Sequence, residues 1–326
     1  MQKNGLNQKH FMLIDDALQK LLPNQSWALE SELGGGLSTS TLYQVTVAEK
    51  QYVVRLTAPE DRHNNLPHEY AVMAIVNKLG IVPHLHYADI ETGIVITDFV
   101  QSQPLFPWSN EQLPLPQLLA DVARTLHRGP TLPQSRTIFD KAVTIVGWLP
   151  AAFQSASPVV EAITFMQSFE PLMHDPAHLR PTHGDINPGN LLFDGRQFWL
   201  IDWASAGQDN FYFDLASSTI FFFYQSEAAE TAFLRAYFER EPTVAEMSIY
   251  ARVSTFCRIY YGLIFLYMSV LRGAALLNVD EVDALPDYPT FMGLIGAGKE
   301  SLDDPLSQQR LGFVYLQWAA RLLVAL

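Results

Sequence analysis

The sequence has a single cysteine and no cluster of basic residues, and each of these absences narrows what the protein can be. Cys257 alone cannot form an internal disulfide, which favours a reducing compartment. Proteins that bind nucleic acid usually carry a face rich in Lys and Arg. Here 21 Lys and Arg residues stand against 34 Asp and Glu residues, a net charge of −13. Nucleic acid is therefore not an expected partner.

A long apolar run is also missing. The best candidate, Ile259 to Leu271, has thirteen residues and is flanked by Arg258 and Arg272. A helix that spans a bilayer needs about 20 apolar residues, so we interpret this segment as a buried helix and expect no membrane insertion. The N-terminal residues lack the apolar stretch and cleavage site of a secretory signal. We expect a cytoplasmic protein, either a monomer or a homodimer.

The apolar pattern predicts an α+β fold of two lobes. In residues 1–100, TLYQVTV and YVVRL are β-rich runs joined by a turn, HEYAVMAIVNKL has a helical pattern that stops at Gly80, and two short strands follow. This is a small antiparallel sheet with one helix. Residues 101–117 are rich in proline and predict a linker. The rest of the second lobe, 101–326, is mainly helical, and its predicted helices are 118–127, 158–169, 228–239, 244–277 and 308–326.

The densest polar motif lies beside the one hairpin of the helical lobe. HGDINPGNLLFDGRQFWLIDW begins at His183 and contains Asp185, Asn190 and Asp202. An Asp-Gly turn between two short strands predicts a hairpin, which returns Asp202 to the neighbourhood of Asn190. An alternative interpretation is a pair of Asp-rich turns that only bend the chain.

These residue types suit phosphoryl transfer. One carboxylate must orient the attacking hydroxyl and accept its proton, and two oxygen ligands must hold Mg²⁺ across the phosphates. Asp185 has the spacing of the first group in kinases, and Asn190 and Asp202 have the spacing of the second. ATP and Mg²⁺ are the expected cofactors.

Three features earlier in the chain occur in the order that a kinase requires. The glycine-rich turn GGGLSTS, residues 34–40, lies between strands, where its backbone amides would cover phosphates. Arg55 lies in the next strand, at the place of a phosphate-pairing cation. Glu69 lies on the following helix, at the place of that cation's partner. Their joint occurrence favours a kinase over turns that only bend the chain.

In HGDINPGN, IDWASAGQDNFYFDLAS, YVVRL and HEYAVMAIVNKLGIVP the chain resembles the aminoglycoside phosphotransferase and choline kinase superfamily. The resemblance extends from about Leu33 to the last helix. It implies a bilobal protein-kinase-like fold, Asp185 as catalytic base, Asn190 and Asp202 as Mg²⁺ ligands, and the Thr97–Val100 backbone as the adenine hinge. The residues expected to bind nucleotide are Gly35, Ser38, Thr39, Arg55, Glu69, Asp98 and Val100.

The acceptor is less well specified. Arg55 in place of lysine, and the spacing from Asp202 to Asp214, are similar to the choline- and thiamine-kinase-like branches. This similarity favours a small-molecule acceptor of the cationic alcohol type, such as choline, ethanolamine or thiamine. Those branches usually have a glutamate where this chain has Ala204, which leaves the particular alcohol open. An aminoglycoside phosphotransferase and a nucleotide-binding pseudokinase are the alternatives. The candidate acceptor residues are Asn187, Trp203, Tyr260 and Tyr261, although aromatic residues at helical spacing also suit a core.

Two further patterns resemble sites but lack the necessary context. GLIGAGK, residues 293–299, has P-loop spacing but is followed by Glu300 where Ser or Thr must meet Mg²⁺, so we expect a loop. His84 and His86 share a strand face without a third ligand nearby, and we expect a polar face rather than a metal site.

Overall fold

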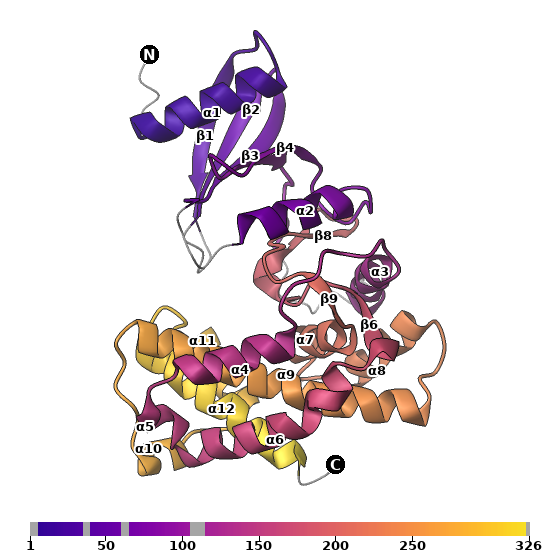
Figure 1. Cartoon of the computed structure of the whole chain (residues 1–326), viewed down its shortest axis with the longest axis vertical. Helices are drawn as coiled ribbons and strands as arrows, with labels where there is room; N and C mark the ends of the chain where they lie inside the picture. Colours follow the sequence, from indigo (N-terminus) through magenta and orange to yellow (C-terminus); the bar gives the residue numbers. More distant parts are fainter. Residues whose placement is uncertain (1–5, 35–39, 60–64, 105–114, 324–326) are drawn as a thin grey trace. The chain divides into compact units, whose positions relative to one another are not determined.

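The computed structural model (Figure 1) describes residues 6–34, 40–59, 65–104 and 115–323. The chain divides by compactness into two units, residues 1–135 with 185–206 and residues 136–184 with 207–326. The segment with the polar motif therefore belongs to the same unit as the N-terminal sheet. The lobes predicted from the sequence divide the chain differently, near residue 100, and that boundary stays a prediction.

The first unit contains a five-stranded antiparallel sheet with the strand order β1-β2-β3-β5-β4. Apolar and polar residues alternate along β2 and β3, which buries one face of the sheet through residues such as Val45 and Val54. Helix α1 (Gln8–Leu21) covers that face (Figure 1), and the Asn7 side chain caps its start. The strands are β1 (Trp27–Leu33), β2 (Thr41–Val47), β3 (Lys50–Leu56), β4 (Leu85–Asp89) and β5 (Ile94–Asp98).

The turn between β4 and β5 requires glycine at position 93. Gly93 has a φ of +70°, and a Cβ atom there would lie 1.8 Å from the backbone oxygen of Thr57. The Thr57 amide donates a hydrogen bond to the Gly93 oxygen at 2.9 Å. The backbones approach so closely that any side chain would force them apart.

Besides α1, the same unit holds the helices α2 (Leu66–Val76) and α3 (Leu115–His127) and the predicted hairpin of β7 (Leu191–Phe193) and β8 (Phe198–Leu200). Asn65 caps α2 by accepting a hydrogen bond from the His68 amide at 3.3 Å, so this helix begins two residues before its predicted start. The Leu200 amide donates to the Ile81 oxygen at 2.7 Å. This bond ties the hairpin to the chain that follows α2.

The second unit is mainly helical and is built around the long helix α9. The α9 helix contacts α12, α7, α6 and α4, and strands β6 and β9 form a separate antiparallel pair. The elements are α4 (Ile138–Trp148), α5 (Ala151–Gln154), α6 (Ser157–Met173), the 3₁₀ turn η1 (Pro176–His178), β6 (Leu179–Thr182), β9 (Gly207–Asn210), α7 (Tyr212–Phe222), α8 (Glu227–Phe238), α9 (Val244–Leu271), α10 (Val279–Asp283), α11 (Tyr288–Gly296) and α12 (Pro305–Leu323).

Helices α9 and α12 contact each other along their lengths (Figure 1), and glycines face each other where they meet. A Cβ atom on Gly262 would lie 2.6 Å from the Leu316 side chain, and one on Gly312 would lie 2.9 Å from the Gly262 oxygen. Such contacts leave no room for a side chain at either position. By length and composition alone α9 is apolar enough to cross a membrane, but 67% of its most apolar window is buried inside the protein. Core helices of soluble proteins have the same character, so this is weak evidence for a span.

Candidate active site

Asp185 and Asn190 lie against each other at the start of the hairpin. The Asn190 side-chain nitrogen donates to the backbone oxygen and to Oδ2 of Asp185, both at 3.0 Å. Asn187 caps the 3₁₀ turn η2 (Pro188–Asn190) by accepting from the Gly189 amide at 2.8 Å, which holds the turn that carries Asn190. Since the amide nitrogen of Asn190 is directed at Asp185, its Oδ1 is the atom suited to a cation.

The hairpin brings the end of β8 back to this turn, as the sequence predicts. The Ile201 amide donates to the Asn190 oxygen at 3.1 Å, so Asp202 is one residue beyond a backbone contact with Asn190. Asp202 has a φ of +64°, a left-handed conformation that costs a non-glycine residue about 1–3 kcal/mol and often marks functional positions. The turn and the hairpin thus place the side chains of Asn190 and Asp202, which both carry oxygen atoms, in the neighbourhood of Asp185.

The predicted cation and its partner are paired in the structure. Arg55 on β3 and Glu69 on α2 lie 2.6 Å apart between Nη2 and Oε1, and their side chains are only 18% and 5% exposed. The alignment is poor for a hydrogen bond, because Oε1 of Glu69 has no partner of good geometry. The contact is therefore an enclosed ion pair that joins the sheet to α2.

Strand β5, which overlaps the predicted adenine hinge, carries a second charged group. Oδ1 of Asp98 lies 2.8 Å from Lys50 Nζ and 2.7 Å from His86 Nε2. Partial burial alone would raise the pKa of Asp98, but the hydrogen bonds from Lys50 and His86 outweigh it and lower that pKa. His86 thus takes part in a polar strand face, and the prediction made for the pair His84 and His86 stays a prediction. Among the described residues no group of three His, Cys, Asp or Glu side chains could hold a metal ion.

The roles predicted for nucleotide binding stay predictions. Val100 follows directly on Phe99, whose amide donates to the Gln51 oxygen at 3.2 Å near the start of β3. Gly35, Ser38 and Thr39 lie outside the described residues.

Asp214 is a buried residue near the candidate site for which the sequence predicted no role. Its carboxylate is completely buried at the start of α7 and accepts hydrogen bonds from the amides of His183 and Gly184, both at 2.8 Å. These two residues directly precede Asp185 in the chain, so Asp214 fixes the backbone that leads to Asp185. An acid in the apolar context FYFDLAS is the signal that predicts a buried carboxylate with such partners.

No role was predicted for His68 either. Its Nε2 lies 2.7 Å from the backbone oxygen of Ala206, and the Ser135 hydroxyl lies 3.5 Å from the same oxygen. Because His68 precedes Glu69 on α2, this contact ties the helix of the ion pair to the segment that follows Asp202.

The aromatic residues suggested for the acceptor lie inside the protein. Trp203, Tyr260 and Tyr261 are 2%, 6% and 5% exposed. The ring centroid of Phe213 is 5.4 Å from that of Tyr260 and 6.2 Å from that of Tyr261, so both tyrosines take part in the core between α7 and α9. A role in acceptor binding stays a prediction for all three and for Asn187.

The P-loop-like segment is not wholly the loop that we expected. Gly293 and Gly296 lie within helix α11, and only the residues after Gly296 form a turn. The expectation was wrong because α11 has apolar residues such as Phe291 that pack inward and hold a helix despite the glycines.

Comparison with known proteins identifies the family. The model of the phosphotransferase enzyme family, the APH family, matches residues 30–250. The chain belongs to this family. No curated protein matches the sequence.

Solved structures of similar fold include kinases of several substrates. The choline kinase from Streptococcus pneumoniae has a TM-score of 0.65 and 16% identity, covering 98% of this chain and 100% of that one. A choline/ethanolamine kinase family protein from Mesorhizobium loti has a TM-score of 0.63 and 20% identity, covering 93% and 99%. The GDP complex of aminoglycoside 2′-phosphotransferase-IIIa has a TM-score of 0.58 and 16% identity, covering 82% and 93%. The predicted α+β, protein-kinase-like fold is confirmed, and so is the prediction of a kinase.

Proposed function

We propose that this phosphotransferase moves a phosphoryl group from Mg²⁺-bound ATP to the hydroxyl of a small molecule, with Asp185 as the base. The observation that carries the proposal is the arrangement of Asp185, Asn190 and Asp202 on one turn and one hairpin. Asn190 holds the Asp185 carboxylate through its amide nitrogen, and the bond from Ile201 keeps Asp202 beside Asn190. This is the set of groups that phosphoryl transfer needs.

The donor atoms fit magnesium. Asp202 offers a carboxylate and Asn190 an amide oxygen, and both are hard oxygen ligands of the kind that Mg²⁺ binds together with phosphates and water. When bound, the ion supplies positive charge that neutralises the phosphate oxygens. Asp185 orients the acceptor hydroxyl and takes its proton.

For the acceptor we favour a cationic alcohol of the choline, ethanolamine or thiamine type. The net charge of −13 supports it, because a negative field attracts cations and repels anionic acceptors. An aminoglycoside is the second candidate, since its amino groups carry the same sign of charge. A pseudokinase is less well supported, because Asp185, Asn190 and Asp202 are all present. We place the enzyme in the cytoplasm.

The test is an ATP-consumption assay with Mg²⁺ on a panel of cationic, neutral, zwitterionic and anionic alcohols and aminoglycosides. Asp185→Asn is the matched variant, because it keeps the size of the side chain but removes the base. We expect it to retain nucleotide binding, measured by thermal shift, and to lose about 10²–10⁴-fold in turnover. Turnover within about tenfold of the parent would contradict the role of Asp185. Fastest turnover of an anionic sugar would overturn the cationic acceptor and leave the kinase in place.

A further inference from the structure

Arg258 on α9 is an enclosed cation without an anionic partner. Its guanidinium carbon lies 3.9 Å from the centre of the Trp318 ring on α12, and its Nη1 donates to the Ser254 oxygen at 2.8 Å. The Nε atom is closed to water and has no hydrogen-bond partner. Among the described residues no carboxylate lies within ion-pair distance of this side chain. Part of the side chain remains open to solvent.

This arrangement is unfavourable unless a ligand completes it. Arginine does not give up its proton in proteins, although burial lowers the pKa of Arg258. Removing such an ion from water without a counter-ion is costly, and the attraction to Trp318 offsets only part of the cost. The chain is rich in acidic residues, yet none of those that the structure describes is paired with this guanidinium. Glu230, which contributes to the field at Arg258, instead accepts a hydrogen bond from Tyr250.

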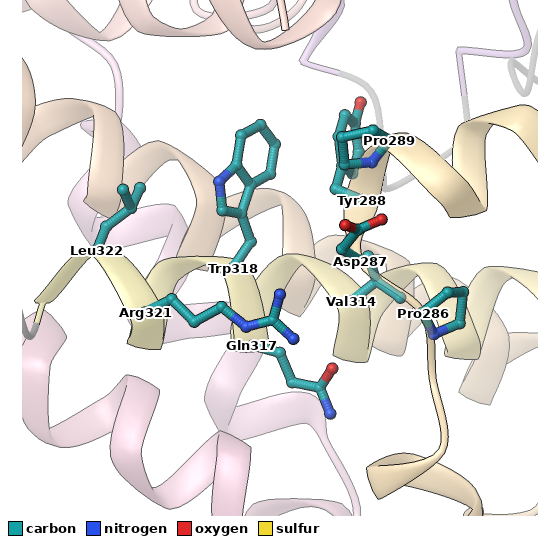
Figure 2. Close-up of a pocket in the computed structure, with 9 residues that line it drawn as sticks. All are labelled: Pro286, Asp287, Tyr288, Pro289, Val314, Gln317, Trp318, Arg321 and Leu322. Atoms are coloured by element: carbon teal, nitrogen blue, oxygen red, sulfur yellow. The ribbon is translucent and has the colours of Figure 1, made fainter. Parts of the chain in front are cut away.

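The surroundings of Arg258 are tyrosine and tryptophan rings. Tyr288 stacks on Trp318 with 4.5 Å between ring centroids, and its hydroxyl lies 3.0 Å from that of Tyr315. Burial raises the pKa of both tyrosines, so they stay protonated. Figure 2 shows Trp318 and Tyr288 projecting to the same side from α12 and α11, along a cavity of about 280 Å³. Since Arg258 and Tyr288 both cover the Trp318 ring, that ring is a poor platform for an external ammonium group.

We propose that Arg258 binds the anionic group, a carboxylate or phosphate ester, of a small molecule. Nη1 of the guanidinium already donates to the Ser254 oxygen. The remaining donors, Nε and Nη2, lie on the other edge of the guanidinium. This is the edge that binds a planar carboxylate or a phosphate through two parallel hydrogen bonds. Because Nε is closed to water in this structure, the proposal requires that the side chain shifts when the anion binds. The site does not depend on the proposed acceptor, and an alcohol that carries both an ammonium and an acidic group would satisfy both proposals.

The test compares anion binding by four forms of the full chain. The probes are inorganic phosphate and acetate at constant ionic strength with chloride as the reference, and the readouts are Tm and ³¹P line broadening of phosphate. Arg258→Met removes the charge and keeps an apolar stem, and Arg258→Lys keeps the charge but loses the paired donors. Arg321→Met is the matched control, because Arg321 is another arginine near Trp318, lines the cavity beside it and is exposed.

We expect phosphate or acetate to raise the Tm of the parent and of Arg321→Met. Binding should weaken at least about tenfold in Arg258→Lys and disappear in Arg258→Met, whose Tm without anion should equal or exceed that of the parent because an unpaired charge is gone. The proposal is overturned if neither anion binds the parent, or if all four forms respond equally, as a general salt effect would give. If Arg258→Met fails to fold, Arg258→Lys with unchanged phosphate affinity overturns it as well. Phosphoryl transfer is not measured, so failure here leaves the kinase proposal untouched.

Discussion

Asn190 connects the proposed base, Asp185, with the hairpin that carries the proposed metal ligand Asp202. Its nitrogen is committed to Asp185 at 3.0 Å and its backbone oxygen to the Ile201 amide at 3.1 Å. An aspartate at this position would place two carboxylates in contact, which would raise the pKa of one of them and favour its protonated form. In the proposed site the amide instead provides an oxygen for the metal without that repulsion.

Asp202→Asn should separate metal binding from the structure of the hairpin. Asparagine tolerates the left-handed backbone at φ +64°, but it lacks the charge that holds Mg²⁺. We expect the Mg²⁺ concentration for half-maximal activity to rise at least about tenfold, together with a fall in kcat, in a Mg²⁺ titration of ATP consumption. The matched control is Asp194→Asn in the same hairpin, where Asp194 accepts from the Arg196 and Gln197 amides. An unchanged metal requirement in Asp202→Asn would make Asp202 a purely structural residue.

At the scale of elements, the helices and strands with a clear hydrophobic period were predicted from the sequence, and those without such a period were missed. The β2–β3 hairpin, α2, α9 and the β7–β8 hairpin are present, and α9 ends at Leu271 because Gly273 turns the chain with a φ of +82°. Helix α7 was not predicted, since nearly all its residues are buried and a helix enclosed on all sides has no apolar stripe. Helix α4 was missed as well, although Thr137 and Asp140 form a capping box at its start.

The site, too, could be predicted from the sequence only where its pattern is local. The spacing His-x-Asp-x₄-Asn places Asp185 and Asn190 on one turn, because the spacing is local. The pairing of Asp214 with the amides of His183 and Gly184 joins residues about thirty positions apart, and no local pattern encodes the partner of a buried acid. The contact between His68 and Ala206 spans an even longer interval. Contacts of this kind require the tertiary fold.

Asp214→Asn tests whether α7 positions the catalytic loop. Only one oxygen remains to serve two backbone donors, so one of them is left unpaired at a cost of about 1–3 kcal/mol. We expect a lower Tm and, at a temperature where the variant is folded, a reduced kcat with little change in the KM for ATP. Asp175→Asn is the control, because Asp175 is more exposed and caps η1 through the Ala177 amide. A lower Tm with an unchanged kcat would show that Asp214 supports only the fold.

At the scale of the whole molecule, one buried acid joins distant parts of the second unit. Asp209 on β9 is 5% exposed and accepts from the Ile138 amide at 2.6 Å and the Asn210 amide at 2.7 Å. The first bond fixes the start of α4, about seventy residues earlier in the chain. Burial raises the pKa of Asp209 to about 6, despite these two hydrogen bonds.

This raised pKa should make the stability of the unit depend on pH. Between its ordinary pKa of 3.8 and about 6 the unfolded chain has lost the proton and the folded chain keeps it, so the folded state binds more protons and stability falls as pH rises. The loss amounts to at most about 3 kcal/mol. Glu246 acts in the opposite direction, because hydrogen bonds from Arg240 hold its pKa at about 2, and its contribution is lost as pH falls below its ordinary value.

The comparison of the parent with Asp209→Asn isolates the effect of Asp209, since Glu246 and all other groups are common to both. The variant cannot ionise at position 209, and it also loses one of the two acceptors. We therefore expect the parent to have the higher Tm at pH 5 and its advantage to shrink as pH rises through about 6, in thermal melts at constant ionic strength. An advantage that stays constant from pH 5 to pH 8, or grows, would mean that Asp209 ionises near its ordinary pKa in the folded protein. Its two hydrogen bonds would then outweigh its burial.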